Sequence, residues 1–198
     1  MKIHTAVFEI SAPGATSYPA RPLPEFAFIG RSNVGKSSLI NMLTRAKGLA
    51  KVSATPGKTR LINFFRIDDT WRLVDLPGYG YAAGPKKDRS QFNQSVADYL
   101  ERRPNLACVF VLIDSRLPPQ PIDLDFLDWL STRQTRWALV FTKADKEPGR
   151  VRGNIALFTQ HLTDTGLPVP EVFISSAKTQ AGRSEILRAI DQTLAALR

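Results

Sequence analysis

The chain has 198 residues, of which 43% are hydrophobic and 23% are charged, a composition that predicts one globular domain and excludes disorder throughout. Its net charge of +9 favours a polyanionic partner, either nucleic acid or an anionic membrane surface, although such a charge can also serve solubility alone. A single cysteine excludes a disulfide framework, and neither a signal-peptide pattern nor a run of about 18 apolar residues is present. We therefore expect a cytoplasmic protein without stable membrane insertion.

The order of apolar and polar runs predicts strands that alternate with helices. A strand at Ala6–Ile10 and an extended, proline-rich segment at Ser11–Pro24 come first. Further strands are expected at Phe26–Ile29, Leu61–Ile67, Trp71–Val74, Leu106–Ile113, Trp137–Phe141 and Val172–Ile174, and helices at Lys36–Thr44, Ser90–Arg102, Ile122–Thr132, Val151–Leu162 and Ser184–Leu197. This pattern predicts a three-layer α/β fold whose sheet is mostly parallel, with one antiparallel strand from the Leu61–Val74 hairpin and with helices on both faces. Residues 1–22 are expected to form the first strand and lead-in of the same domain as residues 23–198.

A phosphate-binding loop lies between the first buried strand and the first helix. Residues 30–37, GRSNVGKS, fit the motif G-x-x-x-x-G-K-[ST] at every position and in the strand–helix context that it requires. Backbone N–H groups of such a loop wrap the phosphates, Lys36 can reach the β- and γ-phosphates, and the Ser37 hydroxyl can bind Mg²⁺. The residues expected at the phosphates are Gly30, Arg31, Ser32, Asn33, Val34, Gly35, Lys36, Ser37 and Ser38.

A second motif, D-x-x-G, begins at Asp75, directly after an apolar strand. In GTPases with this motif the Asp holds Mg²⁺ through water and the Gly N–H faces the γ-phosphate; here these residues are Asp75 and Gly78, with Leu76 and Pro77 between them. The preceding basic loop contains two threonines, and we expect Thr59 rather than Thr55 to bind Mg²⁺ and sense the γ-phosphate, because Thr59 directly precedes a strand. The alternative is a loop whose threonines have no role. Nucleotide contacts in this loop are expected from Gly57, Lys58, Thr59, Arg60 and Leu61, and the residues expected to take part in catalysis are Lys36, Thr59 and Gly78.

Two later segments predict recognition of guanine. Thr142, Lys143, Ala144 and Asp145 resemble the [NT]-K-x-D box, in which one carboxylate accepts both guanine N1–H and N2–H, and adenine offers no such donor pair. Small residues at Ser175, Ser176 and Ala177 resemble the S-A-K loop, which brings a backbone N–H to guanine O6. The predicted ligands are therefore GTP and GDP, and a P-loop kinase or ATPase is the less favoured alternative. Tyr79 stands where Ras-like enzymes carry the Gln that orients water, so we expect slow hydrolysis.

Three runs resemble one family closely, the EngB GTP-binding proteins, also called YihA or YsxC. They are GRSNVGKSSLIN at residues 30–41, TPGKT at 55–59 and DLPGYGYA at 75–82; the last is the most specific, since generic GTPases lack its second half. The resemblance extends from about Phe8 to the last helix and implies a Ras-like G domain over residues 23–198. It implies a switch in assembly of the bacterial large ribosomal subunit that is also needed for normal cell division and septation. By the same resemblance Ser37 and Thr59 would bind Mg²⁺ directly, Asp75 would bind it through water, and Asn33 matches an Asn that holds K⁺ in some related GTPases.

The basic side chains are concentrated in one stretch. Between Phe26 and Ile67 there is no acidic residue and there are eight basic ones, Arg31, Lys36, Arg45, Lys47, Lys51, Lys58, Arg60 and Arg66. We expect this surface, near the loop of Thr59, to contact ribosomal RNA or a large-subunit precursor, with the protein monomeric off the ribosome. Tyr79 and Tyr81 could stack on bases or pack within their own loop, and Asp123, Asp125 and Asp128 are interpreted as a solvated helix face rather than a metal cluster. The remaining alternative is a nucleotide-regulated module for a division or membrane partner, with incidental hydrolysis.

Overall fold

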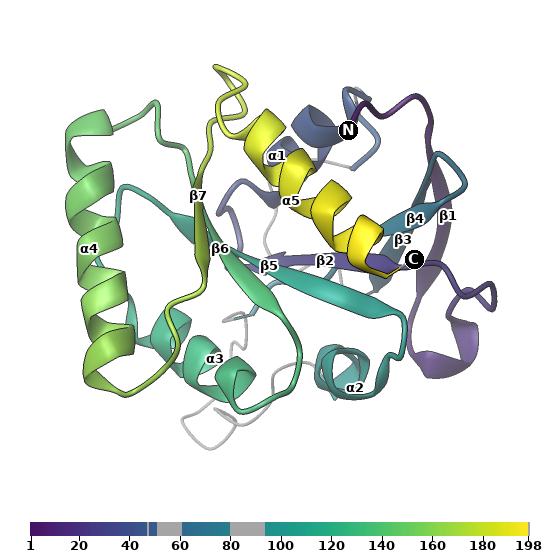
Figure 1. Ribbon diagram of the computed structural model, residues 1–198, viewed down its shortest axis with the longest axis horizontal. Helices are drawn as coiled ribbons and strands as arrows, with labels where there is room; N and C mark the ends of the chain where they lie inside the picture. Colours follow the sequence, from purple (N-terminus) through teal and green to yellow (C-terminus); the bar gives the residue numbers. More distant parts are fainter. Residues whose placement is uncertain (47, 51–60, 80–93, 198) are drawn as a thin grey trace.

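A twisted seven-stranded sheet forms the centre of the described part of the chain (Figure 1). The computed structural model describes residues 1–46, 48–50, 61–79 and 94–197. In spatial order the strands are β1 (Ala6–Ala12), β3 (Ile62–Ile67), β4 (Trp71–Asp75), β2 (Glu25–Gly30), β5 (Leu106–Asp114), β6 (Trp137–Thr142) and β7 (Glu171–Ile174). Only β3 runs against its neighbours, pairing antiparallel with both β1 and β4, while the other pairs are parallel. The predicted α/β fold with one antiparallel strand is confirmed.

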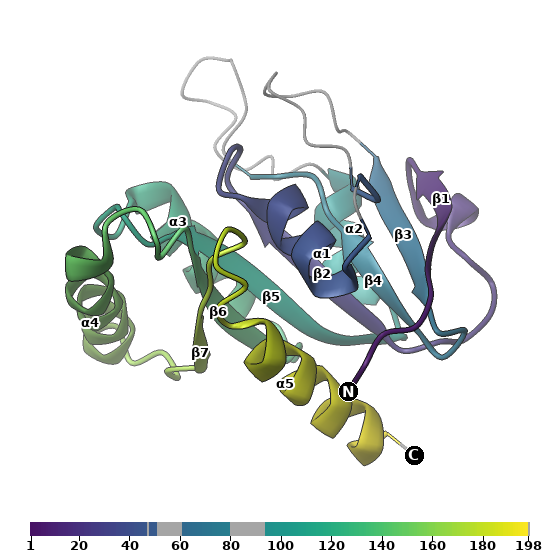
Figure 2. The same cartoon turned by 90° about the horizontal axis from the view of Figure 1, so that it is seen from above.

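Helices cover both faces of this sheet (Figure 2). The helices α1 (Lys36–Thr44) and α5 (Arg183–Ala196) pack on one face, where Leu39, Leu43 and Ile190 belong to one apolar core. The helices α2 (Gln94–Arg102), α3 (Pro121–Ser131) and α4 (Pro148–Asp164) pack on the other face around a second core. A single turn of 3₁₀ helix, Ala15–Ser17, interrupts the segment expected to be extended. No helix in the described ranges combines the length and apolar character needed to cross a bilayer.

The hairpin between β3 and β4 follows from its turn residues. Asp68 and Asp69 both adopt positive φ, 46° and 54°, as the two central residues of a type I′ turn do, and Asp tolerates this region better than most side chains. The Asp68 carboxylate then accepts hydrogen bonds from the backbone N–H groups of His4 and Thr5, at 2.9 and 2.6 Å. The turn therefore also fixes the chain just before β1.

One arginine connects the last helix to the first. Arg183, the first residue of α5, donates from Nε to the carbonyl of Met42 at 3.0 Å and from Nη2 to that of Leu43 at 2.8 Å. These carbonyls lie in the last turn of α1, where the regular donors of the helix run out, although the Met42 carbonyl also accepts the backbone N–H of Arg45 at 3.4 Å. The preceding Gly182 has φ 79°, and a Cβ there would lie 2.2 Å from the Ile174 carbonyl oxygen, so the tight turn into α5 requires glycine.

A buried ionic network closes the amino-terminal end of the sheet. Glu25 and Arg72 are paired in register on β2 and β4, and neither is exposed. Glu25 accepts hydrogen bonds from Arg103 at 2.6 and 2.9 Å and from the Tyr99 hydroxyl at 2.9 Å, and Arg72 also binds Glu9 of β1. Arg72 and Arg103 further donate to the backbone carbonyls of residues 21 and 19, at 2.7 and 3.0 Å. These contacts join Glu9 and the backbone of residues 19 and 21 to the rest of the sheet.

Candidate functional site

The phosphate-binding sequence forms a tight loop between β2 and α1, as its motif requires. Two of its residues adopt the left-handed region, Asn33 with φ 63° and Gly35 with φ 106°, and such turns direct successive backbone N–H groups into one concavity. At the start of the loop, a Cβ on Gly30 would lie 2.7 Å from the carbonyl oxygen of Leu112 on β5. The loop therefore starts in direct contact with the neighbouring strand, and its N–H groups lie at the N-terminus of α1, where an anion is favoured.

Lys36 and Asp75 form an ion pair at the carboxyl ends of the sheet strands. Asp75 is the last residue of β4 and is 6% exposed, and its other oxygen accepts a hydrogen bond from Asn63 at 3.4 Å. The residue predicted to reach the phosphates and the residue predicted to approach Mg²⁺ thus lie together, with Ser37 next to Lys36. Carboxylate and hydroxyl oxygens are suitable ligands for Mg²⁺ shared with phosphate groups, so these residues fit that ion.

The glycine of the D-x-x-G motif touches the phosphate loop. A Cβ on Gly78 would lie 2.7 Å from the carbonyl oxygen of Gly30 and 3.4 Å from the backbone nitrogen of Ser32. The backbone N–H of Leu76 donates to the carbonyl of Phe28 at 3.0 Å, which fixes the chain just before Gly78. The two predicted phosphate-binding segments therefore approach each other so closely that only glycine fits at this position.

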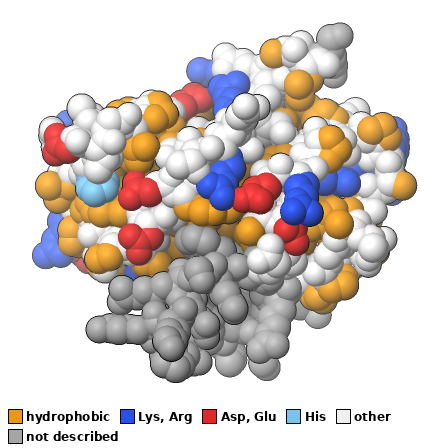
Figure 3. All heavy atoms as spheres, turned by 90° about the horizontal axis from the view of Figure 1, so that it is seen from below, with side chains coloured by type: hydrophobic (Ala, Val, Ile, Leu, Met, Phe, Trp, Pro, Cys, Tyr) orange, Lys and Arg blue, Asp and Glu red, His pale blue; other side chains and the backbone are white. Residues whose placement is uncertain are grey.

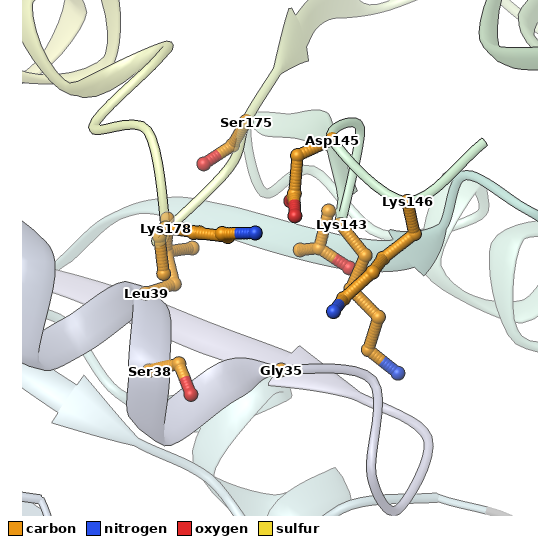
Figure 4. A pocket seen from close by; sticks show the side chains of 10 residues that line it. Gly35, Ser38, Leu39, Lys143, Asp145, Lys146, Ser175 and Lys178 are labelled. Atoms are coloured by element: carbon orange, nitrogen blue, oxygen red, sulfur yellow. The ribbon is translucent and has the colours of Figure 1, made fainter. Parts of the chain in front are cut away.

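A pocket of about 240 Å³ lies between α1 and the two loops predicted to read the base (Figure 4). Asp145 and Ser175 lie on one side of it, and Gly35, Ser38 and Leu39 lie on the other. The full lining is Gly35, Ser38, Leu39, Thr142, Lys143, Asp145, Lys146, Ser175, Ala177 and Lys178. Leu39, Lys146 and Lys178 were not predicted as site residues. Lys178 had a signal in the sequence, as the Lys of Ser-Ala-Lys, whereas Leu39 has the spacing of an ordinary core residue.

Asp145 is oriented by the neighbouring loop. Its Oδ1 accepts a hydrogen bond from the Ser176 hydroxyl at 2.6 Å, and the Ala144 N–H donates to the carbonyl of Ser175 at 3.1 Å. The Ser176 hydrogen bond lowers the pKa of the Asp145 carboxyl below its usual range. At neutral pH this side chain is therefore a carboxylate that only accepts hydrogen bonds, which is what recognition of two N–H donors requires.

Contacts through β6 join the base loops to the phosphate loop. The Thr142 hydroxyl lies 2.6 Å from the carbonyl oxygen of Val34 and 3.1 Å from that of Ile113. Lys143 has φ 59° and its Nζ donates to the carbonyl of Asn33 at 2.5 Å. The two halves of the predicted nucleotide site are thus one connected structure.

The interpretation of Asp123 as part of a solvated face was wrong, whereas Asp125 and Asp128 are exposed. Asp123 is fully buried; its Oδ1 accepts a hydrogen bond from the Tyr79 hydroxyl at 2.9 Å and lies 3.1 Å from Nε of Arg31. Burial raises the pKa of the Asp123 carboxyl, against the opposing effect of Arg31. The reason is tertiary, since the first turn of α3 packs against the phosphate loop. In the part of the chain that is described, no three His, Cys, Asp or Glu side chains are placed to hold a metal ion.

Tyr79 packs within its own loop rather than presenting its ring to a partner. It is 4% exposed and stacks on Phe126 of α3, with ring centroids 4.3 Å apart and planes inclined by 15°. Of the two roles considered for Tyr79, packing therefore fits and base stacking does not. A side chain held in this way cannot orient an attacking water as a glutamine would.

Several predicted residues lie outside the described part of the chain, so their predictions stay untested. Leu61, by contrast, is described and lies directly before β3, 39% exposed. The predicted residues outside the described ranges are Lys47, Lys51, Thr55, Gly57, Lys58, Thr59, Arg60 and Tyr81.

Comparison with known proteins identifies a family with the same motifs. A family model described as "50S ribosome-binding GTPase" matches residues 25–143. The probable GTP-binding protein EngB of Christiangramia forsetii is 50% identical over 192 residues, covering 96% of this chain and 97% of that protein, and the EngB of Bacteroides fragilis is also 50% identical, covering 96% of each.

Among solved structures, the fold resembles a probable GTP-binding protein EngB with a TM-score of 0.69 and 22% identity, covering 87% of this chain and 99% of that chain. It also resembles Era in complex with MgGDPNP and nucleotides of 16S ribosomal RNA, with a TM-score of 0.64 and 22% identity, covering 85% of this chain and 55% of that chain. At such identities these two structures support the fold alone. The identities of the curated relatives and the matched family model go further: this chain belongs to the EngB family of GTP-binding proteins and is a P-loop GTPase.

Proposed function

We propose that this GTPase binds GTP and GDP with Mg²⁺ and acts as a slowly hydrolysing switch in assembly of the bacterial large ribosomal subunit. The observation that carries the nucleotide part is the continuity of the site. The pocket of Asp145 shares Gly35 and Ser38 with the phosphate loop, which leads to the Lys36–Asp75 pair. Base, phosphates and metal therefore each have matching chemistry along one connected surface.

The proposed role of each group follows from its chemistry. Backbone N–H groups of residues 30–38 and the ammonium of Lys36 hold the phosphates, while the Asp145 carboxylate accepts two hydrogen bonds from guanine. Ser37, Asp75 and Thr59 would hold Mg²⁺, which supplies positive charge against the charge that develops on the phosphate oxygens. Gly78, in contact with the phosphate loop, would donate its N–H to the γ-phosphate.

Slow hydrolysis is proposed from the burial of Tyr79. The side chain that follows Gly78 is held by Asp123 and Phe126, so it supplies no group to position water. A K⁺ ion near Asn33 could supply part of the missing positive charge. Measuring GTP hydrolysis in KCl and in NaCl, with and without ribosomal particles, tests this; equal rates in both salts would remove the K⁺ proposal.

The ribosomal partner is proposed from the charge of the chain and from its similarity to ribosome-binding GTPases. The matched family is described as ribosome-binding, and Era, a relative by fold, was crystallised with ribosomal RNA. On the face nearest α2 and α3, Lys and Arg side chains are interspersed with Asp and Glu among the described residues (Figure 3). We therefore propose that the RNA contact lies within the acid-free stretch between residues 26 and 67, which includes the phosphate loop. We also propose a monomeric cytoplasmic protein, with any effect on division and septation following from ribosome supply.

Co-sedimentation with ribosomal particles tests the switch. We expect binding to 50S particles or their precursors with a non-hydrolysable GTP analogue, loss of binding with GDP, and weakening as salt rises. Asp145→Ala is the matched control, because it removes base recognition and leaves the basic stretch intact. Particles that bind equally in both nucleotide states would contradict a switch, and no binding in either state would favour a division or membrane partner. Competition of GTP against ATP for a fluorescent GDP distinguishes the GTPase site from an adenine-nucleotide site.

A further inference from the structure

Asp114 lies at the junction of the base loops and the phosphate loop but belongs to none of the recognised motifs. It is the last residue of β5 and pairs in register with Thr142, the last residue of β6. It is only 5% exposed. A buried carboxylate is costly unless it is paired, so its partners indicate its purpose.

The first partner is the lysine of the guanine box. Lys143 Nζ donates to Asp114 Oδ2 at 2.9 Å, and the same nitrogen donates to the carbonyl oxygen of Asn33 at 2.5 Å. The Lys143 backbone has φ 59°, a region that costs a non-glycine residue about 1–3 kcal/mol and persists only where the surrounding structure enforces it. Lys143 is thus held at both ends, by its strained backbone and by its ammonium.

The second partner is Arg116, which binds the same carboxylate. Its Nε lies 2.9 Å from Oδ1 and its Nη2 2.7 Å from Oδ2, and its backbone N–H donates to Oδ1 at 3.2 Å. Burial by itself would raise the pKa of the Asp114 carboxyl, but the hydrogen bonds from Arg116 and Lys143 outweigh it and lower that pKa to about 2. At neutral pH Asp114 is therefore a carboxylate.

We propose that Asp114 is a positioning residue for nucleotide binding: it holds the Lys143 ammonium against the phosphate loop, so that the aliphatic stem of Lys143 stays beside the base pocket. This inference rests on the proposed binding of guanine nucleotide in that pocket. Without the carboxylate, Lys143 keeps one contact at its tip, to Asn33, and its long side chain regains rotamers that do not face the base. Lys143 lines the base pocket and Asp114 does not, so the effect of Asp114 passes through Lys143.

A purely structural role makes a different prediction, because Asp114 also fixes the loop after β5 through Arg116. Arg116→Met removes that contact and leaves Lys143 paired with Asp114; the arginine side chain is 36% exposed, so its loss is tolerable. Asp114→Asn keeps the shape of the side chain and removes its charge. Lys143→Met keeps most of the aliphatic stem and removes the ammonium.

The dissociation rate of a fluorescent GDP analogue, measured for these variants and for the double variant, tests the proposal. We expect dissociation about tenfold faster in Asp114→Asn, the loss expected of one charge-assisted hydrogen bond, and a change within about twofold in Arg116→Met. In the Lys143→Met background, Asp114→Asn should add no further change, because the residue through which it acts is already altered. GDP and GTP analogues should be affected by the same factor, since the contact lies at the base end of the site.

Three results would overturn the proposal: an unchanged rate in Asp114→Asn, effects of the two substitutions that multiply, or an effect of Arg116→Met as large as that of Asp114→Asn. If Asp114→Asn does not fold, Asp114→Glu keeps the charge but displaces it by one methylene, and its dissociation rate should lie between those of the wild type and Lys143→Met; a wild-type rate would again count against the role. Failure of the wild-type protein to bind the GDP analogue would contradict the proposed function instead.

Discussion

The two ends of the central sheet carry charged residues in opposite arrangements. At the amino-terminal end, Glu25 and Arg72 are fully buried, and each has several protein partners. At the carboxyl-terminal end, Lys36, Asp75 and Asp145 line a loop system and an open pocket, and each has one or two protein contacts. At the amino-terminal end, the charged side chains therefore use their hydrogen-bonding groups within the protein. At the carboxyl-terminal end, these three side chains retain hydrogen-bonding groups that a ligand could use. The contrast teaches that the buried charges at one end serve structure alone, whereas at the other end paired carboxylates such as Asp114 and Asp123 lie beside the groups that we propose bind a ligand.

The largest effect should come from a substitution at the carboxyl-terminal end of the sheet, at the residue proposed to recognise the base. In Asp145→Asn the amide presents a donor to guanine N2–H₂, so we expect GDP affinity to fall about 10⁴-fold, roughly 5–6 kcal/mol. The same amide can pair with the N1–H and the 2-oxo group of xanthine, so xanthosine diphosphate should gain affinity. Calorimetric titration with both nucleotides measures this, and the free energy of unfolding should stay within about 0.5 kcal/mol of the wild type. A stability loss as large as the affinity loss would show that the two ends do not differ as described.

The next effect should come from the structural end. Arg72→Met removes the central cation of the amino-terminal network, and we expect unfolding by denaturant to become easier by about 3–5 kcal/mol, because Glu25 and Glu9 lose a buried partner. GDP dissociation from the folded protein should be unchanged. Glu9→Gln is the milder control, since the Glu9 side chain is 27% exposed and its loss should cost about 1 kcal/mol. Faster GDP release in Arg72→Met would show that the two ends are coupled.

A smaller effect is expected where a buried network lies at the ligand end. Tyr79→Phe removes the hydroxyl that binds Asp123 and keeps the ring stacked on Phe126. The free energy of unfolding should fall by about 1–3 kcal/mol, because Asp123 loses a donor while remaining buried. Since burial raises the pKa of Tyr79 well above its ordinary value, this donor persists at alkaline pH, and the loss should be the same at pH 7 and pH 9. An unchanged unfolding midpoint would mean that the hydrogen bond between Tyr79 and Asp123 contributes no more to stability than a solvent-exposed one does.

The smallest effect should appear away from both ends. Gly153 lies inside α4, and a Cβ added there meets nothing within 4 Å. Gly153→Ala should raise the free energy of unfolding by about 0.5–1 kcal/mol through helix propensity and leave GDP affinity unchanged. Thermal unfolding of this variant beside the wild type gives the baseline for the other substitutions. A destabilised Gly153→Ala would indicate that α4 has neighbours beyond the described contacts.

The order of the elements and the positions of the loops could be predicted from the sequence because both depend on local patterns. The helix predicted at Lys36–Thr44 has those bounds, while the strand predicted at Leu106–Ile113 extends to Asp114, whose polar side chain hid the strand end. The phosphate and base loops were recognisable because each motif is a short contiguous run.

The ionic partnerships could not be predicted, because they join distant positions. Glu25 and Arg103 are 78 positions apart, and Lys143 and Asp114 are 29 positions apart. Asp123 is instructive, since Asp123, Phe126, Leu127 and Leu130 are the buried residues of α3 and follow the spacing of one helix face. If the apolar face is taken as Ile122, Phe126 and Leu130, Asp123 falls on the solvated side. If Asp123 is instead grouped with Leu127, four residues later, the helical period places Asp123 on the buried face. The period does not indicate that Tyr79 and Arg31 are the partners of Asp123.

The hydrogen bonds from Arg183 to the end of α1 have a consequence for local opening. The nine residues of α1 begin at the phosphate loop, and the last turn of α1 is hydrogen-bonded by Arg183. Arg183 begins α5, which follows the base loop of Ser175–Ala177. The phosphate loop and the base loop are therefore connected through α1 as well as through β6. A local unfolding event that frees either loop must release α1 at one of its ends. Protection of their amides against hydrogen exchange should therefore rise and fall together, as a single cooperative unit that spans both halves of the nucleotide.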